Sequence, residues 1–204
     1  MNGTHVADLA TGVPVFDATL VNGSIITNNQ LLLSSKHSQC MKIRDIVINE
    51  IGLTMAVWFK VSSSFKNYMP IATFGNGNIT QDYIFIGLFP HVVFVFVVVN
   101  TVPYSLVTPI DTTINSWHHF AWEMIPTGTL EMIPTGTWTL YVDGQVSIQD
   151  TFKPYPPQIT RSVNYLGFTG FAAGYFNGSL RDFRVYNRSL SAGDVKLLSA
   201  TTPV

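Results

Sequence analysis

The sequence is poor in charge and has a single cysteine. Lysine and arginine number 11 and aspartate and glutamate 12, so that only 11% of the residues are charged and the formal net charge is −1. Ordinary globular proteins carry roughly 25% charged residues. A near-neutral chain without a basic run lacks the electrostatic footprint of nucleic-acid-binding proteins, and we expect no nucleic-acid partner. Cys40 cannot form an internal disulfide, so we interpret it as a small buried hydrophobic residue.

Segments that would direct the chain to or through a membrane are also missing. Met1–His5 has no basic region followed by an apolar core, so no signal peptide is visible; a leader has been removed, or export takes another route, for example inside a virion. The most apolar stretch, Ile84–Val99, is shorter than the ~20 residues of a membrane-spanning helix and is interrupted by Pro90-His91. Its Val, Phe and Ile residues suit a pleated sheet, and we predict two buried strands, Tyr83–Phe89 and Val92–Val99, instead of a membrane span.

The sequence does contain enough apolar material for one large core. Hydrophobic residues make up 47% of the chain, with 14 Phe, 8 Tyr and 4 Trp, and the length fits a single domain over residues 1–204. Thr54–Val61 alternates between two faces, and Asp143-Gly144 between two further alternating runs predicts a β-hairpin. No helical periodicity intervenes between the predicted strands, which indicates a sandwich or jelly roll. The other predicted strands are Val13–Val21, Gln30–Ser34, Met69–Phe74, Trp117–Met124, Trp138–Val142, Gln145–Ile148, Asn164–Phe168 and Leu180–Tyr186.

One helix is predicted, at the C-terminus. Ser191 is expected to be its N-cap and Asp194 the partner of Ser191 in a capping box. Leu190 and Val195 stand at the positions of a hydrophobic staple. The helix is short, so packing against the rest of the domain must stabilise it.

An octapeptide is repeated in tandem. Glu123–Leu130 reads EMIPTGTL, and Glu131–Trp138 follows directly with EMIPTGTW. Because eight is an even number, the duplication leaves every later strand residue on its original face. We interpret the repeat as the extension of a hairpin loop without chemistry of its own; a functional flap and an error in the sequence are the alternatives.

Four segments together resemble the laminin-G-like domains of the concanavalin A-like family. Order and spacing agree with the family from about residue 10 to residue 198 if one copy of the octapeptide counts as inserted. These segments belong to the structural framework of the family, so the resemblance predicts the fold and gives little information about the ligand. They are Thr54–Lys60, Asn115–Ala121 (NSWHHFA), Trp138–Gly144 (WTLYVDG) and Phe176–Ser191 (FNGSLRDFRVYNRSLS).

The resemblance implies an all-β fold: a two-sheet antiparallel jelly-roll sandwich of the concanavalin A-like kind, completed by the short C-terminal helix. Family members serve as carbohydrate-binding or adhesion modules, sometimes with a calcium ion at the rim. The chain departs from the family pattern at Val21–Ser24, which is a reduced form of the usual opening motif. Arg181 stands at the first of two paired aspartate positions and leaves only Asp182. A positive charge at this position makes the calcium site that the resemblance implies less favourable in this chain.

Two sets of residues are candidates for ligand binding. The loop of Asn76, Asn78 and Asp82 offers amide oxygens and one carboxylate, which would hold calcium, the one cofactor that we consider. Sugar binding needs an exposed aromatic platform beside hydrogen-bonding groups. The aromatic candidates in predicted loops are Tyr104, Tyr155, Phe171 and Tyr175.

Two functional patterns are excluded by spacing. His118 and His119 are neighbours on a predicted strand and point to opposite faces, so the two rings cannot chelate one ion. The laminarinase-like enzymes that share the family fold use a Glu-x-Asp-x-x-Glu strand. None of Glu50, Glu123 and Glu131 has an aspartate two residues later. We therefore predict that the protein is not an enzyme and keep glycoside hydrolysis as the third hypothesis.

The first functional hypothesis is a non-catalytic carbohydrate-binding or adhesion module of an extracellular, cell or virion surface, with a glycan or glycoprotein as partner. The second is a structural subunit that assembles with copies of itself into a fibril, coat or virion decoration, because a nearly uncharged surface repels its neighbours weakly. Acceptor sequences for N-glycosylation are compatible with both hypotheses. The favoured acceptors are Asn22 and Asn78, and the less favoured ones are Asn2, Asn177 and Asn187.

Overall fold

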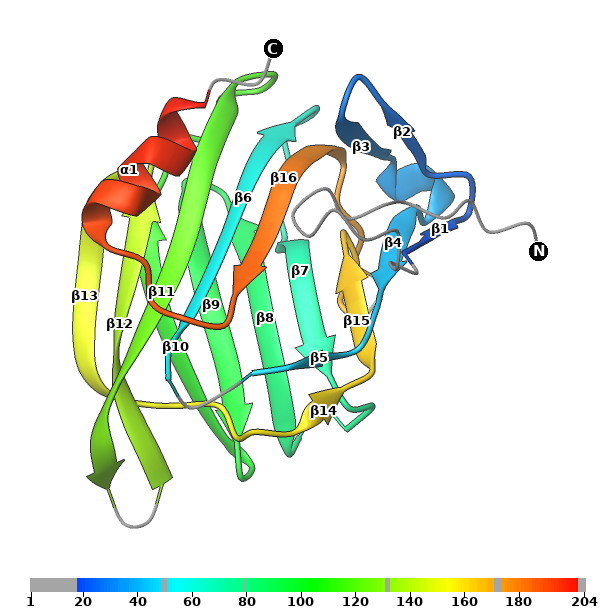
Figure 1. Cartoon of the computed structure of the whole chain (residues 1–204). Helices are drawn as coiled ribbons and strands as arrows, with labels where there is room; N and C mark the ends of the chain where they lie inside the picture. The colour runs from blue at the N-terminus through cyan, green and yellow to red at the C-terminus, as the bar shows by residue number, and fades with distance from the viewer. Residues whose placement is uncertain (1–17, 49–50, 79, 131–132, 171–173, 202–204) are drawn as a thin grey trace.

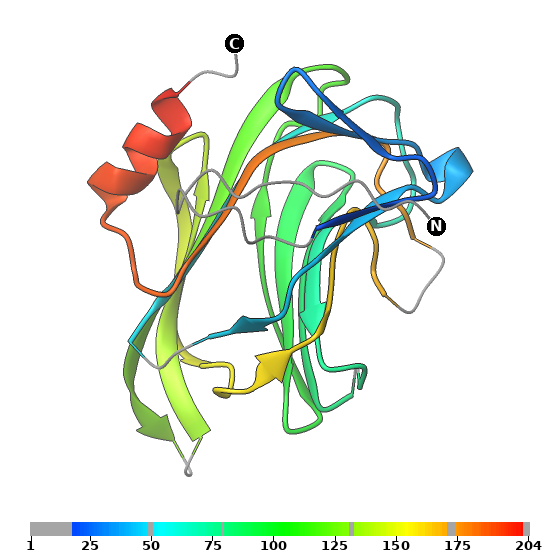
Figure 2. The same ribbon diagram turned by 45° about the vertical axis from the view of Figure 1, so that its right-hand side comes forward.

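Two antiparallel sheets of seven strands lie face to face and enclose the core (Figures 1 and 2). This computed structural model describes residues 18–48, 51–78, 80–130, 133–170 and 174–201. The predicted all-β sandwich with one short C-terminal helix is confirmed over the described residues. None of the helices in this part of the chain is long and apolar enough to cross a membrane.

The first sheet contains the meander that the apolar run of the sequence predicted. Strands β8 (Asp82–Phe89) and β9 (Val92–Val99) are joined at Pro90-His91, and His91 takes the left-handed conformation that a tight turn requires (φ 65°). Both predicted strands are therefore confirmed, with the first beginning one residue earlier than expected. In spatial order the sheet consists of β1 (Thr19–Val21), β4 (Cys40–Ile43), β15 (Val163–Leu166), β7 (Met69–Gly75), β8 (Asp82–Phe89), β9 (Val92–Val99) and β10 (Val102–Pro109).

The second sheet contains the hairpin that Asp143-Gly144 predicted. Both residues have positive φ, 49° and 76°, as a two-residue hairpin turn requires. A bulge at Asp182 interrupts the last strand of the chain. In spatial order the sheet consists of β13 (Gln145–Pro154), β12 (Ile133–Val142), β11 (Trp117–Leu130), β6 (Leu53–Val61), β16 (Gly178–Tyr186), β3 (Gln30–Leu33) and β2 (Ile25–Thr27).

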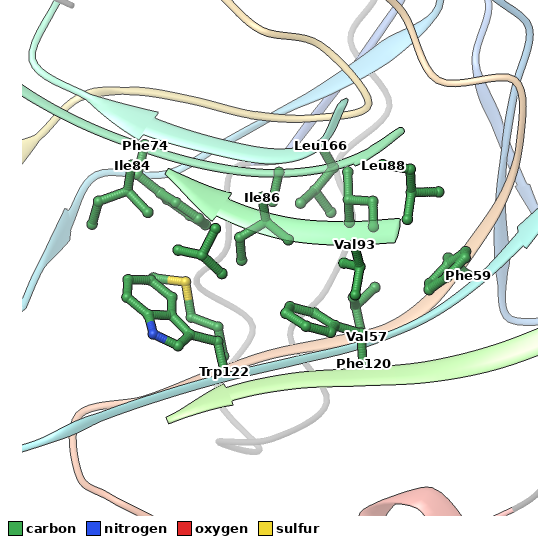
Figure 3. Close-up of a cluster of buried hydrophobic side chains, with 14 of the residues drawn as sticks. Val57, Phe59, Phe74, Ile84, Ile86, Leu88, Val93, Phe120, Trp122 and Leu166 are labelled. Atoms are coloured by element: carbon green, nitrogen blue, oxygen red, sulfur yellow. The ribbon is translucent and has the colours of Figure 1, made fainter. Parts of the chain in front are cut away.

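Along the central strands every second side chain points inward, and these side chains form the core between the two sheets. On β6 the residues Val57 and Phe59 face Ile86 and Leu88 of β8, as Figure 3 shows. The alternation predicted for this strand is therefore confirmed. Trp122 of β11 packs edge to face against Trp138 of β12, with ring centroids 5.2 Å apart.

Several short or exposed strands were not predicted from the sequence. The strand β10 carries Pro103 and Pro109 and alternates weakly, and β2 and β4 have only three and four residues. Of the predicted strand Val13–Val21 only β1 is described, because residues 13–17 lie outside the described part of the chain. A small third sheet pairs β5 (Ile46–Val47) with β14 (Thr160–Arg161), and η1 (Ser35–His37) is a single 3-10 turn.

The C-terminal helix α1 (Ala192–Ala200) begins as the sequence predicted. The Asp194 backbone N–H donates to Ser191 Oγ, and the Ser191 N–H donates back to the Asp194 carboxylate, which completes the capping box. Leu190 and Val195 are buried together, as a hydrophobic staple requires, over the outer face of the second sheet (Figure 1). Cys40 is buried as expected, and burial raises the pKa of its thiol to about 11.

Candidate functional site

The outer face of the first sheet carries an unusual density of aromatic side chains. Strand alternation in β8 and β9 sends one set of residues into the core and turns Phe85, Phe94 and Phe96 to the outside. Because both faces of these strands are apolar, their sequence reads as a continuous hydrophobic run. We call the side chains on this face the outer aromatic cluster: Tyr68, Tyr83, Phe85, Phe89, Phe94 and Phe96.

The rings of this cluster hold each other in fixed orientations. The Tyr68 ring stands edge-on to Phe85, at 5.9 Å between centroids, and to Phe89, at 6.3 Å. Phe89 stacks on Phe94 at 5.0 Å and still leaves 42% of its surface exposed at the end of β8. Gly87 provides room for the Phe85 ring, because a Cβ atom at this glycine would lie 2.8 Å from Phe85 Cζ. The cluster therefore ends in an exposed, preorganised aromatic surface.

Next to this surface two loops enclose a shallow hollow. It consists of two adjoining cavities of about 210 and 400 Å³ that share Lys66, Asn67 and Tyr68. We call it the rim hollow. Its other lining residues come from η1, from the loop before β7, from the end of β8 and from the segment before β16: Ser35, Ser63, Ser64, Phe65, Met69, Phe89, Gly174, Tyr175 and Asn177.

Hydrogen bonds join the two loops of the rim hollow, and ring stacking fixes the segment before β16. Asn177 Nδ2 donates to Ser63 Oγ at 2.8 Å, and the Ser62 backbone N–H donates to the Asn177 carbonyl at 3.1 Å. Tyr175 stacks on Phe168 with centroids 4.7 Å apart and an angle of 12° between the rings. A ligand would therefore meet side chains whose positions are already set, which lowers the entropic cost of binding.

The chemistry of the rim hollow is aromatic and polar with little charge. Lys66 is the one charged residue among the lining residues, and none of them is a carboxylate. Aromatic faces bury apolar surface, while amides and hydroxyls donate and accept hydrogen bonds and so orient a ligand. Such a surface suits a ligand with both C–H faces and hydroxyl groups.

Of the aromatic residues predicted for a ligand site, the structure brings only Tyr175 to the rim hollow. Tyr155 was expected in an exposed loop and is instead 1% exposed, because its ring packs into the core while its N–H donates to the Pro134 carbonyl. Tyr104 is half-buried on β10 and packs against the core. Phe171 lies outside the described residues. The sequence analysis did not identify Tyr68, because its ring reaches the outer aromatic cluster only through tertiary packing.

The predicted calcium residues already have donors from the protein. Asp82 Oδ1 accepts from Arg161 Nη2 at 2.7 Å in a buried ion pair. Asn76 Oδ1 accepts from the Asn78 N–H, and Asn78 Oδ1 accepts from both the N–H and the hydroxyl of Thr80. Within the described residues no three His, Cys, Asp or Glu side chains form a group able to hold a metal. A calcium ion at this loop would compete with these donors, and the calcium site stays a prediction.

The two neighbouring histidines lie on opposite faces of β11, as predicted. The His118 ring packs by Phe59 of the core, and its Nδ1 lies 3.2 Å from Asp143 Oδ2. His119 stands edge-on to Trp58 at 5.2 Å on the outer face. Both histidines thus have framework contacts.

Glu123 is the glutamate whose side chain the structure describes, since Glu50 and Glu131 lie outside the described residues. It is buried and accepts from the Tyr141 hydroxyl at 2.8 Å. Burial raises the pKa of this carboxyl. The contacts are those of a structural pair on the second sheet.

The glycosylation candidates differ in their surroundings. Asn22, Asn78 and Asn187 are exposed, whereas Asn177 is half-buried and bonded to Ser63. Asn2 lies outside the described residues. Glycosylation at any of these positions stays a prediction.

Comparisons with known proteins agree with this architecture. A family model described as the concanavalin A-like lectin/glucanases superfamily (Laminin_G_3) matches residues 35–196. No curated protein sequence matches the chain significantly.

Among solved structures, the ligand-binding domain of botulinum neurotoxin serotype D in complex with N-acetylneuraminic acid is similar, with a TM-score of 0.68 at 13% identity over 90% of this chain and 45% of that one. The chain thus spans about half the length of that domain. Domain 4 of the GH43 extracellular arabinanase AbnA from Geobacillus stearothermophilus, in complex with arabinotriose, is similar with a TM-score of 0.66 at 16% identity, over 90% of this chain and 81% of that one.

Proposed function

The chain belongs to the concanavalin A-like lectin/glucanase superfamily, and from this premise we propose that it is a non-catalytic carbohydrate-binding or adhesion module. The family resemblance of its sequence motifs is confirmed. Both solved structures named above are in complex with a sugar, and the neurotoxin structure is that of a ligand-binding domain. We propose an extracellular or particle surface as its place of action and a glycan or glycoprotein as its partner.

The observation that carries this proposal is the composition of the rim hollow. Tyr68 and Phe89 present aromatic surface beside the exposed side chains of Asn67 and Lys66. The hydrophobic face of a pyranose or furanose ring packs on such aromatic surface, while its hydroxyl groups bond to amides. The single lysine allows a neutral or an acidic sugar.

We expect a glycan array to give hits, and Tyr68→Ala to weaken binding of the best hit roughly tenfold, which corresponds to the loss of about 1.4 kcal/mol of binding free energy. The physical reason is the loss of the ring that joins the rim hollow to the outer aromatic cluster. The array is run with and without calcium, and affinities are measured by calorimetry. Arabinotriose and sialylated glycans are included as probes.

Two further variants show whether binding depends on the rim hollow. Asn67→Ala removes an exposed amide without touching the packed rings, and we expect it to weaken binding as well. Phe152→Ala removes an exposed aromatic ring on β13, outside the rim hollow, and should bind like the natural protein. An array without hits in either buffer would overturn the proposal, and release of sugar from a bound oligosaccharide would favour the hydrolase instead.

A further inference from the structure

Three asparagines in the described part of the chain are followed directly by a glycine: Asn22, Asn76 and Asn177. In such a pair the backbone nitrogen of the glycine reaches Cγ of the asparagine easily, because glycine has no Cβ atom in the way and its backbone turns freely. The attack releases the side-chain amide, so it requires that the protein leaves both groups free. The surroundings of the three pairs differ in this respect.

The pair that begins with Asn177 is held on both sides. Asn177 Nδ2 donates to Ser63 Oγ at 2.8 Å, and the Asn177 carbonyl accepts from the Ser62 N–H at 3.1 Å. Gly178 begins β16, where a Cβ atom would collide with the Lys60 carbonyl. The amide that would leave is therefore bonded, and the backbone has no room to rearrange.

The pair that begins with Asn22 is anchored through its side chain. Asn22 Nδ2 donates to the Ser38 carbonyl at 2.8 Å. The Gly23 carbonyl accepts from Gln39 Nε2 at 2.9 Å. Both bonds tie this turn to the segment that follows η1, so the side-chain amide of Asn22 is also held in place.

The pair that begins with Asn76 lies in the loop between β7 and β8 and lacks such anchors. Asn76 and Gly77 are exposed, and no group of the residues that the structure describes bonds to Asn76 Nδ2 or to the Gly77 N–H. The nearest atom that a Cβ at Gly77 would meet is Val163 Cγ2, at 3.8 Å. The attacking nitrogen and the amide that leaves are therefore both free.

The oxygen of the same side chain has a donor that favours the attack. Asn76 Oδ1 accepts from the Asn78 backbone N–H at 3.0 Å. When the Gly77 nitrogen adds to Cγ, negative charge develops on this oxygen, and a backbone N–H at such a distance stabilises it. Because the attacking atom belongs to the next residue, no second molecule has to be brought into position for this step.

We propose that Asn76 is a site of spontaneous deamidation, with water as the co-reactant. The Gly77 nitrogen forms a bond to Asn76 Cγ and gives up its proton, the bond from Cγ to Nδ2 breaks, and Nδ2 leaves as ammonia. Water then opens the resulting succinimide ring at either carbonyl, which gives aspartate or isoaspartate at this position. Nothing is oxidised or reduced. The product is one charge more negative, and its new carboxylate stands in the loop predicted for calcium.

The test follows the three pairs in one sample. Protein made in bacteria, which do not attach N-linked glycans to Asn22, is incubated at mildly alkaline pH, folded in buffer and unfolded in urea. Peptide mapping by mass spectrometry measures the fraction of amide lost at each asparagine. In the folded chain we expect Asn76 to react at least about tenfold faster than Asn22 and Asn177. In urea the three should react at similar rates, because the protecting contacts are gone.

Two variants identify the site. Asn76→Asp reproduces one product and should elute with the acidic form that the natural chain gains in the folded sample on ion exchange. Asn22→Ser removes the amide of an anchored pair and should leave the rate at Asn76 unchanged. The incubation continues until the Asn76 peptide has reacted in urea. The proposal is overturned if Asn76 then still keeps its amide in the folded chain, or if Asn22 or Asn177 reacts there as fast as Asn76.

Discussion

Arg161→Met is expected to lower the free energy of unfolding by about 3–5 kcal/mol. The Arg161 side chain is 0% exposed and donates to Asp82 Oδ1 at 2.7 Å and to the Pro157 carbonyl at 3.1 Å. Without the guanidinium, the buried Asp82 carboxylate has lost its ion-pair partner. Urea titration at neutral pH, followed by tryptophan fluorescence, measures the change.

A double variant separates the buried charge from the lost packing. Asp82→Asn combined with Arg161→Met removes the uncompensated carboxylate, and we expect it to be more stable than Arg161→Met alone by about 1–2 kcal/mol. Lys153→Met serves as the control, because its ion pair with Asp150 at 2.8 Å is partly solvent-exposed and should contribute less than about 1 kcal/mol. If Arg161→Met proved as stable as Lys153→Met, the ion pair would have no structural role.

The stability of the protein is expected to fall by about 3 kcal/mol as the pH decreases from 6.5 to 4, on account of His119 alone. Burial against Trp58 lowers the pKa of His119 to about 4, while the charges of Asp143 and Asp182 act in the opposite direction. Between these pH values the unfolded chain binds a proton that the folded chain does not. The contribution of His119 is therefore complete above pH 6.5 and is lost toward pH 4.

His119→Phe retains a ring against Trp58 and removes the titration, so the variant should lose most of this pH dependence. His37→Gln changes an exposed histidine of η1 and should leave it unaltered. Both variants are compared with the natural chain by urea unfolding at several pH values between 4 and 7.5. An unchanged pH dependence in His119→Phe would contradict the assignment to this residue.

Local signals in the sequence were sufficient for the elements whose geometry is itself local. The alternation of Thr54–Val61, the Asp143-Gly144 turn and the Ser191 capping box each depend on neighbours within a few residues, and each is found in the structure. The strands β2, β5 and β14 escaped prediction because two or three residues carry too little pattern. The strands β5 and β14 also pair with each other across more than a hundred residues, beyond any window of sequence.

The rim hollow was only partly accessible to sequence reasoning. Tyr175 was proposed for a ligand site, and Asn177 was noted only as a glycosylation acceptor. Tyr68 and Phe89 were missed, although both belong to the cluster, because their contact joins a loop to the far end of another strand. For Tyr155 the error was the opposite: it was predicted to be available for a ligand in a loop, and its side chain is buried in the core.

The amino-acid sequence alone determined the class of the fold, its family and the low share of charged residues. The fold class follows from composition and from periodicity along the chain, and the family follows from the resemblance of four framework segments. Only the tertiary structure decided that Arg161 neutralises Asp82 across 79 positions and that two loops enclose the rim hollow. Such features depend on which distant segments become neighbours, and the packing of the whole core sets that choice.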